Sequence, residues 1–305
     1  MGYPSSYLLV TPVREDAEQL DDLAATIRAQ ERLPALWVII DDGSADDTMA
    51  RLQRISARLP WVHGIALPRL ADGQCRSQAD LLTRGFRTAT QLAEAERIDH
   101  HYMVHVDADL RCAPQLLAEL VGRCERDRGV GMASCGITEV GDDGRVLRTR
   151  EVVDGVPRAE LRVWRRECIE ELGMRPIPRW AESTGVRARN RGWRTPVFTD
   201  LMVEASEAGV LRGGLRGFRQ HGAEGWQVGL HPLVLAERAV AASVHDRDLR
   251  GVAMVAGYVE AAISGRRRSQ DPELREYFGD DLLEERARRL LSRVPMVGRR
   301  FTRRR

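Results

Sequence analysis

The chain contains no lysine, so all 47 basic residues among its 305 amino acids are arginine. A P-loop nucleotide site needs a lysine that reaches the phosphates, and Schiff-base catalysis needs a lysine amine. The absence of lysine therefore excludes both classes of enzyme.

Cysteine pairs and long apolar runs are also missing. The chain has five cysteines: Cys75, Cys112, Cys124, Cys135 and Cys168. They form no CxxC pair and are odd in number, which is typical of a reducing cytosol and argues against a zinc site. Residues 1–10 lack the basic start and apolar core of a signal peptide, and no run of about 18 apolar residues could span a bilayer. We therefore expect a cytoplasmic protein.

Positive charge is concentrated at the C-terminus. The formal net charge is +2, and the segment from Arg286 to Arg305 contains nine arginines and no acid, so the preceding 285 residues carry −7 by difference. Aromatic residues do not interleave these arginines, which favours an anionic membrane surface over nucleic acid. Peripheral contact with the inner face of a membrane is therefore one hypothesis. Intramolecular packing or a homodimer, with a solvated tail, is the alternative.

Short apolar runs alternate with amphipathic segments through residue 126. The expected strands are Tyr7–Thr11, Leu36–Ile40, Val62–Leu67 and Tyr102–Val106, and the expected helices are Asp16–Ala29, Asp46–Ala57, Cys75–Glu96 and the segment after Pro114. Each strand is almost continuously apolar, which is typical of a parallel sheet with helices on both faces. The pattern predicts an α/β fold.

Two of the expected strands end in carboxylates. Asp107 and Asp109 follow the fourth strand, and Asp41 and Asp42 follow the second. In open α/β sheets, ligands bind at the carboxyl ends of the strands. Two acids one residue apart can share Mg2+ or Mn2+, which prefer oxygen ligands and accept diphosphate oxygens beside them. Taken alone, each acidic strand end is also typical of a polar turn that caps a helix.

The pattern changes beyond residue 126. Gly131–Thr138 is predicted to be a strand, and Val140–Val163, with its Gly-Asp-Asp-Gly turn, is predicted to form antiparallel hairpin structure. Three later segments have helical periodicity: Trp226–Val240, Leu249–Ile263 and Asp280–Val294.

Three motifs occur in a fixed order with matching strand contexts. They are TPVRE at Thr11–Glu15, IIDDGSADDT at Ile39–Thr48 and HVDADL at His105–Leu110. Together they resemble family-2 glycosyltransferases, which transfer a sugar from a nucleoside diphosphate donor, over roughly residues 6–200. The resemblance implies the Rossmann-like, mostly parallel sheet of the A-type glycosyltransferase fold.

The resemblance also implies a role for each motif. The residues expected to hold the donor nucleotide are Thr11, Pro12, Glu15, Asp41, Asp42 and Asp107. The residues expected to hold Mn2+ or Mg2+ are Asp107 and Asp109. A UDP-type donor is expected, and the sequence does not identify the sugar.

The acceptor side is expected between Val163 and Leu201. Val163–Gly173 resembles the family's strand-to-helix element, which ends at a glycine. Relatives then carry an acid at the start of a basic helix, usually within Glu-Asp or Trp-Asp, where this chain has Trp-Ala-Glu-Ser. Glu182 is the one carboxylate between Met174 and Thr199, so it is the candidate general base.

Two departures leave the acceptor side open. Glu182 is also the ordinary first-turn acid that a helix dipole favours, in which case Asp200 or Glu204 is the next candidate base. Some relatives carry a histidine pair where this chain has Val203–Ser206.

The prediction is an inverting, metal-dependent hexosyltransferase acting on a glycan or lipid-linked acceptor in polysaccharide, glycolipid or cell-envelope glycan synthesis. Residues 1–224 form the glycosyltransferase domain, with a nucleotide-sugar half (1–126) and an acceptor half (127–224), and residues 225–305 form a helical C-terminal extension. One alternative is a non-catalytic nucleotide-sugar-binding scaffold. A sugar nucleotidyltransferase is less favoured, because TPVRED is not the Gly-rich phosphate loop that such an enzyme needs.

Overall fold

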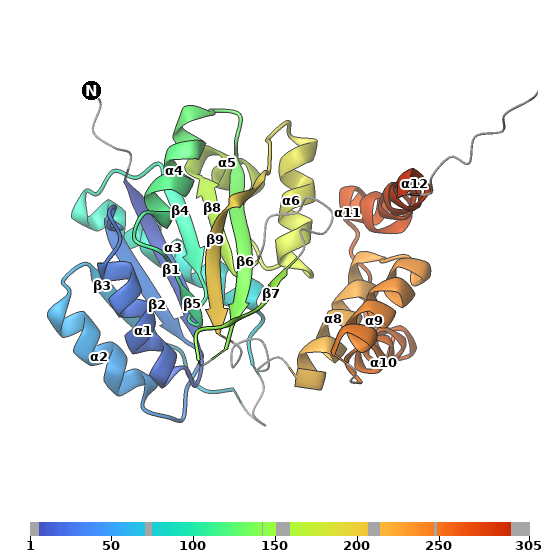
Figure 1. Cartoon of the computed structure of the whole chain (residues 1–305), viewed down its shortest axis with the longest axis horizontal. Helices are drawn as coiled ribbons and strands as arrows, with labels where there is room; N and C mark the ends of the chain where they lie inside the picture. Colours follow the sequence, from blue (N-terminus) through green and yellow to red (C-terminus); the bar gives the residue numbers. More distant parts are fainter. Residues whose placement is uncertain are drawn as a thin grey trace, which may run out of the picture. The chain divides into compact units, whose positions relative to one another are not determined.

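The apolar runs at the start of the chain form strands, as predicted. The computed structural model describes residues 6–70, 75–141, 143–150, 159–206, 214–246 and 249–293, and side chains 244–246 and 289–293 lie outside this description. The first strands are β1 (Tyr7–Val13), β2 (Leu36–Asp41), β3 (Val62–Ala66) and β4 (Tyr102–Val106). They pair in parallel in the order β3-β2-β1-β4 (Figure 1), so their carboxyl ends meet at one edge.

The rest of the sheet is mixed. Its strands are β5 (Leu110–Arg111), β6 (Met132–Val140), β7 (Val146–Arg150), β8 (Leu161–Arg165) and β9 (Val197–Ser206). Strand β8 lies antiparallel between β4 and β6, β9 runs parallel to β6, and β5 and β7 pair antiparallel with β9 and β6. The predicted hairpin is confirmed for β6 and β7, whereas residues 142 and 151–158 of its expected range lie outside the described residues.

Helices cover both faces of the sheet. Helices α1 (Ala17–Arg28), α2 (Thr48–Arg58) and α4 (Leu116–Arg126) share one apolar core, and α3 (Gln78–Glu96), α5 (Arg166–Leu172) and α6 (Trp180–Asn190) share the other. Because strand side chains alternate, Leu9 of β1 joins the first core and Leu8 and Val10 join the second. This three-layer arrangement confirms the α/β prediction.

One expected boundary in this part of the chain shifts, and one strand was not predicted. Helix α3 begins at Gln78 rather than Cys75, because Ser77 has an extended backbone and its hydroxyl accepts a hydrogen bond from the Asp80 amide at 3.2 Å. Strand β9 was not predicted, because its exposed and half-buried residues give no clear alternation.

Residues 214–305 form a second packed unit, after a first unit that spans residues 1–213. Its helices are α8 (Gly214–Val228), α9 (Pro232–Asp246), α10 (Arg250–Ile263), α11 (Pro272–Glu276) and α12 (Leu282–Arg293), with a π-helical turn at Tyr277–Asp281. The expected single helix Trp226–Val240 is wrong, because Gly229 has a φ of +80° that ends α8, and Pro232 begins α9. The expected domain boundary after residue 224 falls inside α8.

Glycines set the spacing of the helices in this second unit. A Cβ added at Gly222 of α8 would lie 1.8 Å from the Met254 carbonyl oxygen of α10, and one at Gly257 of α10 would lie 1.8 Å from the Arg219 carbonyl oxygen of α8. Gly251 approaches α9 in the same way, at 1.9 Å from the Ala239 carbonyl oxygen. The backbones of these helices therefore touch directly.

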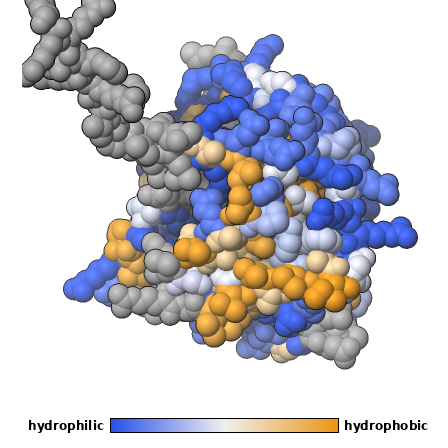
Figure 2. Space-filling view, turned by 90° about the vertical axis from the view of Figure 1, so that its right-hand side faces the viewer, coloured by the Kyte–Doolittle hydropathy of each residue, from blue (hydrophilic) through white to orange (hydrophobic). Residues whose placement is uncertain are grey.

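Aliphatic side chains are exposed on α9 and α10: Leu233, Val240, Val252, Val255, Val259 and Ile263. Figure 2 shows hydrophobic residues gathered on one face of the molecule. Apolar surface of this kind is typical of a contact with another molecule. No helix in the described ranges combines the length and apolar character needed to cross a bilayer.

Replacing Gly85 of α3 with Ala is expected to destabilise the protein. Ala normally stabilises a helix by about 0.5–1 kcal/mol relative to Gly, but here its Cβ would lie 2.4 Å from Val10 Cγ1 in β1. Overpacking of this kind costs roughly 1–3 kcal/mol. The matched control is Gly122→Ala in α4, where the nearest atom is the flexible Arg126 Nη1 at 3.4 Å. Urea denaturation of both variants tests the difference, and equal stability would contradict the close packing of α3 on β1.

Candidate active site

Asp107 is held in place at the carboxyl end of β4. Its backbone N–H donates to the Glu160 carbonyl at 2.9 Å, which ties the loop to the start of β8. Its Oδ1 lies 2.8 Å from His105 Nε2 and accepts from Gln78 Nε2 at 3.3 Å. His105 is fully buried, and its Nδ1 has no hydrogen-bond partner among the described atoms. With Nε2 as the donor, His105 orients one oxygen of Asp107 and leaves the other for a ligand.

Asp109 lies two residues further on, so its charge interacts with that of Asp107. Burial and the Asp107 carboxylate raise the pKa of Asp109 to about 7, Glu160 adds to this effect, and Arg150 opposes it. Its carbonyl oxygen accepts from the Ser206 N–H at 3.2 Å, which joins the loop to the end of β9. Two carboxylates that repel each other in a partly buried loop are a setting in which a bound cation is favourable.

A divalent cation fits this pair by its donor chemistry. Within the described residues, Asp107 and Asp109 form no ion pair with arginine, unlike most acids around them. In the same described ranges, no three His, Cys, Asp or Glu side chains gather closely enough to hold a metal ion by themselves. The protein would therefore supply two carboxylate ligands and leave the remaining positions to substrate oxygens or water.

Glu139 of β6 anchors two arginines beside this loop. Arg148 donates to it through Nε and Nη2, at 2.5 and 2.8 Å, and Arg150 donates through Nε at 2.5 Å. Arg150 also contacts Glu160. Burial alone would raise the pKa of Glu139, but the hydrogen bonds from both arginines outweigh it and hold that pKa below its usual value.

Asp41 and Asp42 reach the same edge of the sheet at the end of β2. Both are 1% exposed, and both carboxylates are engaged by the protein. Asp41 accepts from the backbone and side chain of Ser44. Asp42 accepts from Arg14 Nη1 at 3.1 Å and from the Arg76 amide at 3.0 Å. In the structure, these two acids hold the loop in place through their hydrogen bonds to other residues of the protein. Their contact with a nucleotide stays a prediction.

The residues of the first motif, Thr11–Glu15, lie partly in the core and partly on the surface. Thr11 is fully buried, and its hydroxyl accepts from Trp37 Nε1 at 3.0 Å, so its side chain does not face a ligand. Pro12 lies opposite Ile40 of β2 near the end of β1. Glu15 is exposed, has a φ of +54°, and donates its N–H to Ser44 Oγ at 2.8 Å. The Glu15 carboxylate is about half exposed and lies 3.6 Å from Arg69 Nη2.

Glu182 lies in the first turn of α6, as predicted. Its side chain is 24% exposed, and Arg179 grips both oxygens, with Nε–Oε2 at 2.8 Å and Nη2–Oε1 at 2.7 Å. Arg179 precedes the helix with a φ of +49°. Glu182 is therefore reachable by solvent and held in one orientation. Its function as a base stays a prediction.

Arg162 of β8 was not identified from the sequence as a residue of the candidate site. It is fully buried against the rings of Trp164 and Trp180, at 5.3 and 5.5 Å from their centres, and its Nη1 donates to the Ala181 carbonyl at 3.0 Å. Burial lowers its pKa to about 9, which Glu160 and Glu182 oppose, so it is charged at neutral pH. The only signal in the sequence was one arginine inside the apolar run Leu161–Trp164. His105 gave a clearer signal, because strand alternation places it on the same face as Asp107.

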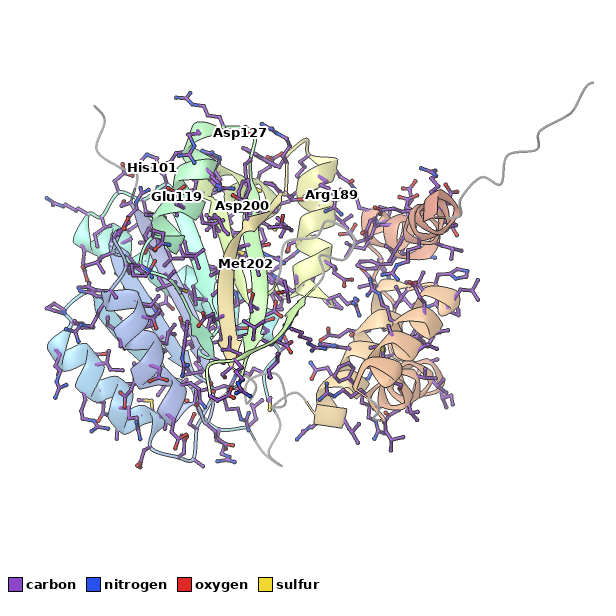
Figure 3. All side chains as sticks on the ribbon, viewed as in Figure 1. His101, Glu119, Asp127, Arg189, Asp200 and Met202 are labelled. Atoms are coloured by element: carbon purple, nitrogen blue, oxygen red, sulfur yellow. The ribbon has the colours of Figure 1, made fainter. Side chains whose placement is uncertain are left out.

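The two reserve candidates for the base lie elsewhere on β9. Asp200 accepts from Arg123 Nη1 of α4 at 2.7 Å and lies in the irregular stretch of β9 before Met202. Met202 is itself four strand residues, roughly 13 Å, from Ser206. It is one of the residues labelled in Figure 3. Glu204 lies opposite Arg111 of β5. The structure therefore does not bring Asp200 to the Asp107–Asp109 loop.

The fold and the acidic strand ends define an A-type glycosyltransferase fold. The sequence profile of "Glycosyl transferase family 2" matches residues 9–193, and the chain belongs to this family. A search of curated proteins gave no match.

The chain is similar to several solved structures at low sequence identity. A mannosyltransferase from Pyrobaculum calidifontis, in complex with GDP-Man and Mn2+, is 17% identical with a TM-score of 0.55, covering 95% of this chain and 81% of that one. GalNAc-T7 with UDP, GalNAc and Mn2+ is 15% identical with a TM-score of 0.49, covering 66% of this chain and 43% of that one. S. aureus TarS 1–349 with UDP is 14% identical with a TM-score of 0.47, covering 72% of this chain and 65% of that one.

Replacing Glu139 with Gln is expected to lower the unfolding free energy at pH 7 by roughly 1–3 kcal/mol, the range for hydrogen bonds to charged groups. The folded-state pKa is lowered, so the wild-type advantage is complete above the ordinary Glu pKa of 4.5 and is lost as the pH falls through the folded value. Denaturation between pH 3 and 7 measures this. Glu119→Gln, which removes an exposed pair with Arg126, is the control and is expected to change little. A Glu139→Gln deficit that persists unchanged at pH 3 would contradict the assignment.

Proposed function

We propose that this protein is an inverting glycosyltransferase that moves a hexose from a nucleoside diphosphate donor, most simply a UDP-sugar, to an acceptor hydroxyl. The observation that carries the proposal is the pair Asp107 and Asp109, two mutually repelling carboxylates at the carboxyl end of the parallel strands, in a family-2 chain. The GDP-Man and Mn2+ bound to the mannosyltransferase from Pyrobaculum calidifontis support a nucleoside diphosphate sugar as the donor.

The donor side would work as follows. Asp107 and Asp109 would hold Mn2+ or Mg2+, which supplies positive charge against the departing diphosphate. His105 and Gln78 keep Asp107 in the orientation that this requires. The loops after β1 and β2, joined through the hydrogen bond from Glu15 to Ser44, would form the side of the site that takes the base and ribose.

The acceptor side would rest on Glu182. To act as a base, its carboxylate must take a proton from the acceptor hydroxyl, and one of its oxygens must exchange the Arg179 contact for that hydroxyl. Arg179 then remains on the second oxygen, which keeps the carboxylate in its orientation. Arg162, bonded to the first turn of α6, fixes the helix beneath it.

The acceptor class is proposed from the resemblance alone: a glycan or lipid-linked saccharide of polysaccharide, glycolipid or envelope synthesis. Peripheral membrane contact through Arg286–Arg305 stays a prediction, and residues 294–305 lie outside the described residues. Arg286 itself is 11% exposed and ion-paired with Glu237, so it is not available to lipid. The exposed aliphatic residues of α9 and α10 are the better described candidates for such contact.

A non-catalytic nucleotide-sugar-binding scaffold is the second candidate. The observation that favours it is the bidentate contact of Arg179, because a carboxylate with both oxygens engaged is a weak proton acceptor. Turnover distinguishes the two: a scaffold binds a donor with Mn2+ but neither transfers nor hydrolyses it.

Asp109→Ala is expected to abolish metal-dependent binding of the donor nucleotide and to leave the fold intact, because it removes a repelled loop carboxylate rather than a core group. Calorimetric titration with UDP and with GDP, each with and without Mn2+, measures this. The control is Asp99→Ala, which removes an acid that is 80% exposed before β4. Unchanged Mn2+-dependent affinity in a folded Asp109→Ala protein would refute the metal assignment.

Glu182→Gln is expected to lower the rate of transfer by roughly 10²-fold or more, since it keeps size but removes the proton acceptor, while donor affinity barely changes. Glu167→Gln is the matched control, because Glu167 is the exposed first-turn acid of the neighbouring helix α5. If Glu182 serves only the helix dipole, both variants retain near-normal transfer and lose similar stability. That outcome would place the base elsewhere, with Glu204 next.

A further inference from the structure

A cavity of about 610 Å³ opens in the first unit and is not used by the proposed reaction. It lies between the C-terminal turns of α4 and α6 and the start of β9. Its lining residues are Arg123, Arg126, Asp127, Val130, Arg189, Trp193, Arg194, Thr195, Pro196 and Phe198. A volume of this size is typical of a site for a small molecule.

The cavity lies at the opposite end of the sheet from Asp107 and Asp109. Val130 precedes β6, whose first residue, Met132, pairs with Trp164 at the far end of β8 from the acidic loop. Strand β9 runs from Phe198 in the cavity wall to Ser206, which bonds to Asp109. Phe198 pairs with Cys135 of β6 and Ser206 pairs with Val140, and these five steps along β6 span roughly 17 Å. Asp127, Arg189 and Asp200 lie toward this end in Figure 3, whereas Met202 lies further along β9. The cavity is therefore separate from the candidate active site.

The charge of the lining favours an anion. Four arginines and one aspartate line the cavity. Arg194 is ion-paired with Asp127, Arg123 with Asp200 and Arg126 with Glu119. These three acids orient three of the guanidinium groups, and the four arginines together still leave a net positive charge. The planar fork of arginine matches the oxygens of a phosphate or carboxylate.

Two rings give the cavity an apolar wall. The guanidinium of Arg123 lies 4.9 Å from the centre of the Phe198 ring, so cation and ring present a joint surface. Trp193 is fixed by its Nε1–H, which donates to Glu171 at 2.7 Å, and by close packing on Gly131, where an added Cβ would lie 2.8 Å from Trp193 Cβ. A ligand that touches both rings and arginines needs an apolar face as well as a charge.

The wall is built into the fold and does not depend on mobile side chains alone. The Arg194 N–H donates to the Gly129 carbonyl at 2.9 Å, and its carbonyl accepts from Gly131 at 3.1 Å. Arg165, at the end of β8, donates through its Nε to the Val130 carbonyl at 2.9 Å. The segment before β6 and the segment before β9 are thus held together, which keeps the cavity open between them.

We propose that this cavity is a second ligand site, which binds a ring that carries a phosphate or carboxylate group. The anion would meet Arg126 and Arg189, and the ring would lie against Trp193 and Phe198. Such a group occurs on an acidic saccharide unit and on an aromatic phosphate. The shared chemistry is a ring-bearing anion, and the site acts independently of the donor-binding loop.

The test is calorimetric titration of the full chain with four probes: glucose 6-phosphate, phenyl phosphate, glucose and inorganic phosphate. We expect a ring-bearing phosphate to bind more tightly than inorganic phosphate and glucose not to bind. Tighter binding of glucose 6-phosphate assigns the site to acidic saccharides, and tighter binding of phenyl phosphate assigns it to aromatic anions. Equal affinity for inorganic phosphate would overturn the proposal, because the rings would then contribute nothing.

Variants locate the binding. Arg126→Ala, at a side chain that is 66% exposed, is expected to fold normally and to weaken binding about tenfold, the factor for one charge-assisted hydrogen bond. Arg145→Ala, at an 86% exposed arginine in the turn before β7, and Asp109→Ala are expected to leave the affinity unchanged. Loss of binding in Asp109→Ala would mean that the probes enter the donor site. That result, the absence of millimolar binding by either ring-bearing probe, or an unaffected Arg126→Ala variant would each refute the second site.

Discussion

A buried arginine connects the two sides of the candidate active site. Arg162 lies on β8 directly opposite His105, the residue that orients Asp107, and it bonds to the first turn of α6, which carries Glu182. Removing a charge from water costs several kcal/mol unless partners compensate. Here the compensation comes from the α6 carbonyl, the flanking tryptophan rings and the charges of Glu160 and Glu182. If α6 moved away from β8, that cation would lose the Ala181 carbonyl, Trp180 and Glu182, so the spacing between the two sides is held.

Arginine organises most of the remaining charge at this edge of the sheet. Asp42, Glu139 and Glu182 each accept from one or two guanidinium groups. A planar fork fixes both the position and the direction of a carboxylate, whereas a lysine would act as a point charge. Within the described residues, the Asp107–Asp109 pair lacks such a partner. The contrast is chemically sensible, because acids that arginines already neutralise would have little left to offer a metal.

The predictable parts of the fold were those in which one local signal dominates. Continuous apolar runs marked β1, β2 and β4, because strands buried on both faces admit few polar residues. The acidic loop after β4 could be recognised because two carboxylates one residue apart at a strand end are typical of a metal site. Strand β9 could not be predicted, because it is defined by pairing with strands that are distant in sequence. The end of α8 at Gly229 could not be predicted, because it depends on one backbone angle. The role of Arg162 and the arginine-lined cavity depend on residues more than 15 positions apart, which no local pattern reports.

The direct backbone contacts among α8, α9 and α10 bear on how this part of the chain can evolve. Most exposed positions on these helices can exchange among residues that favour helix, since surface substitutions usually change stability by less than about 0.5 kcal/mol. Gly222, Gly251 and Gly257 have no such freedom, because even one methyl group would occupy the space of a carbonyl oxygen on the neighbouring helix. In sequences that diverge from this one, substitutions would accumulate on the outer faces of these helices. The three glycines would be retained even where most other residues have changed.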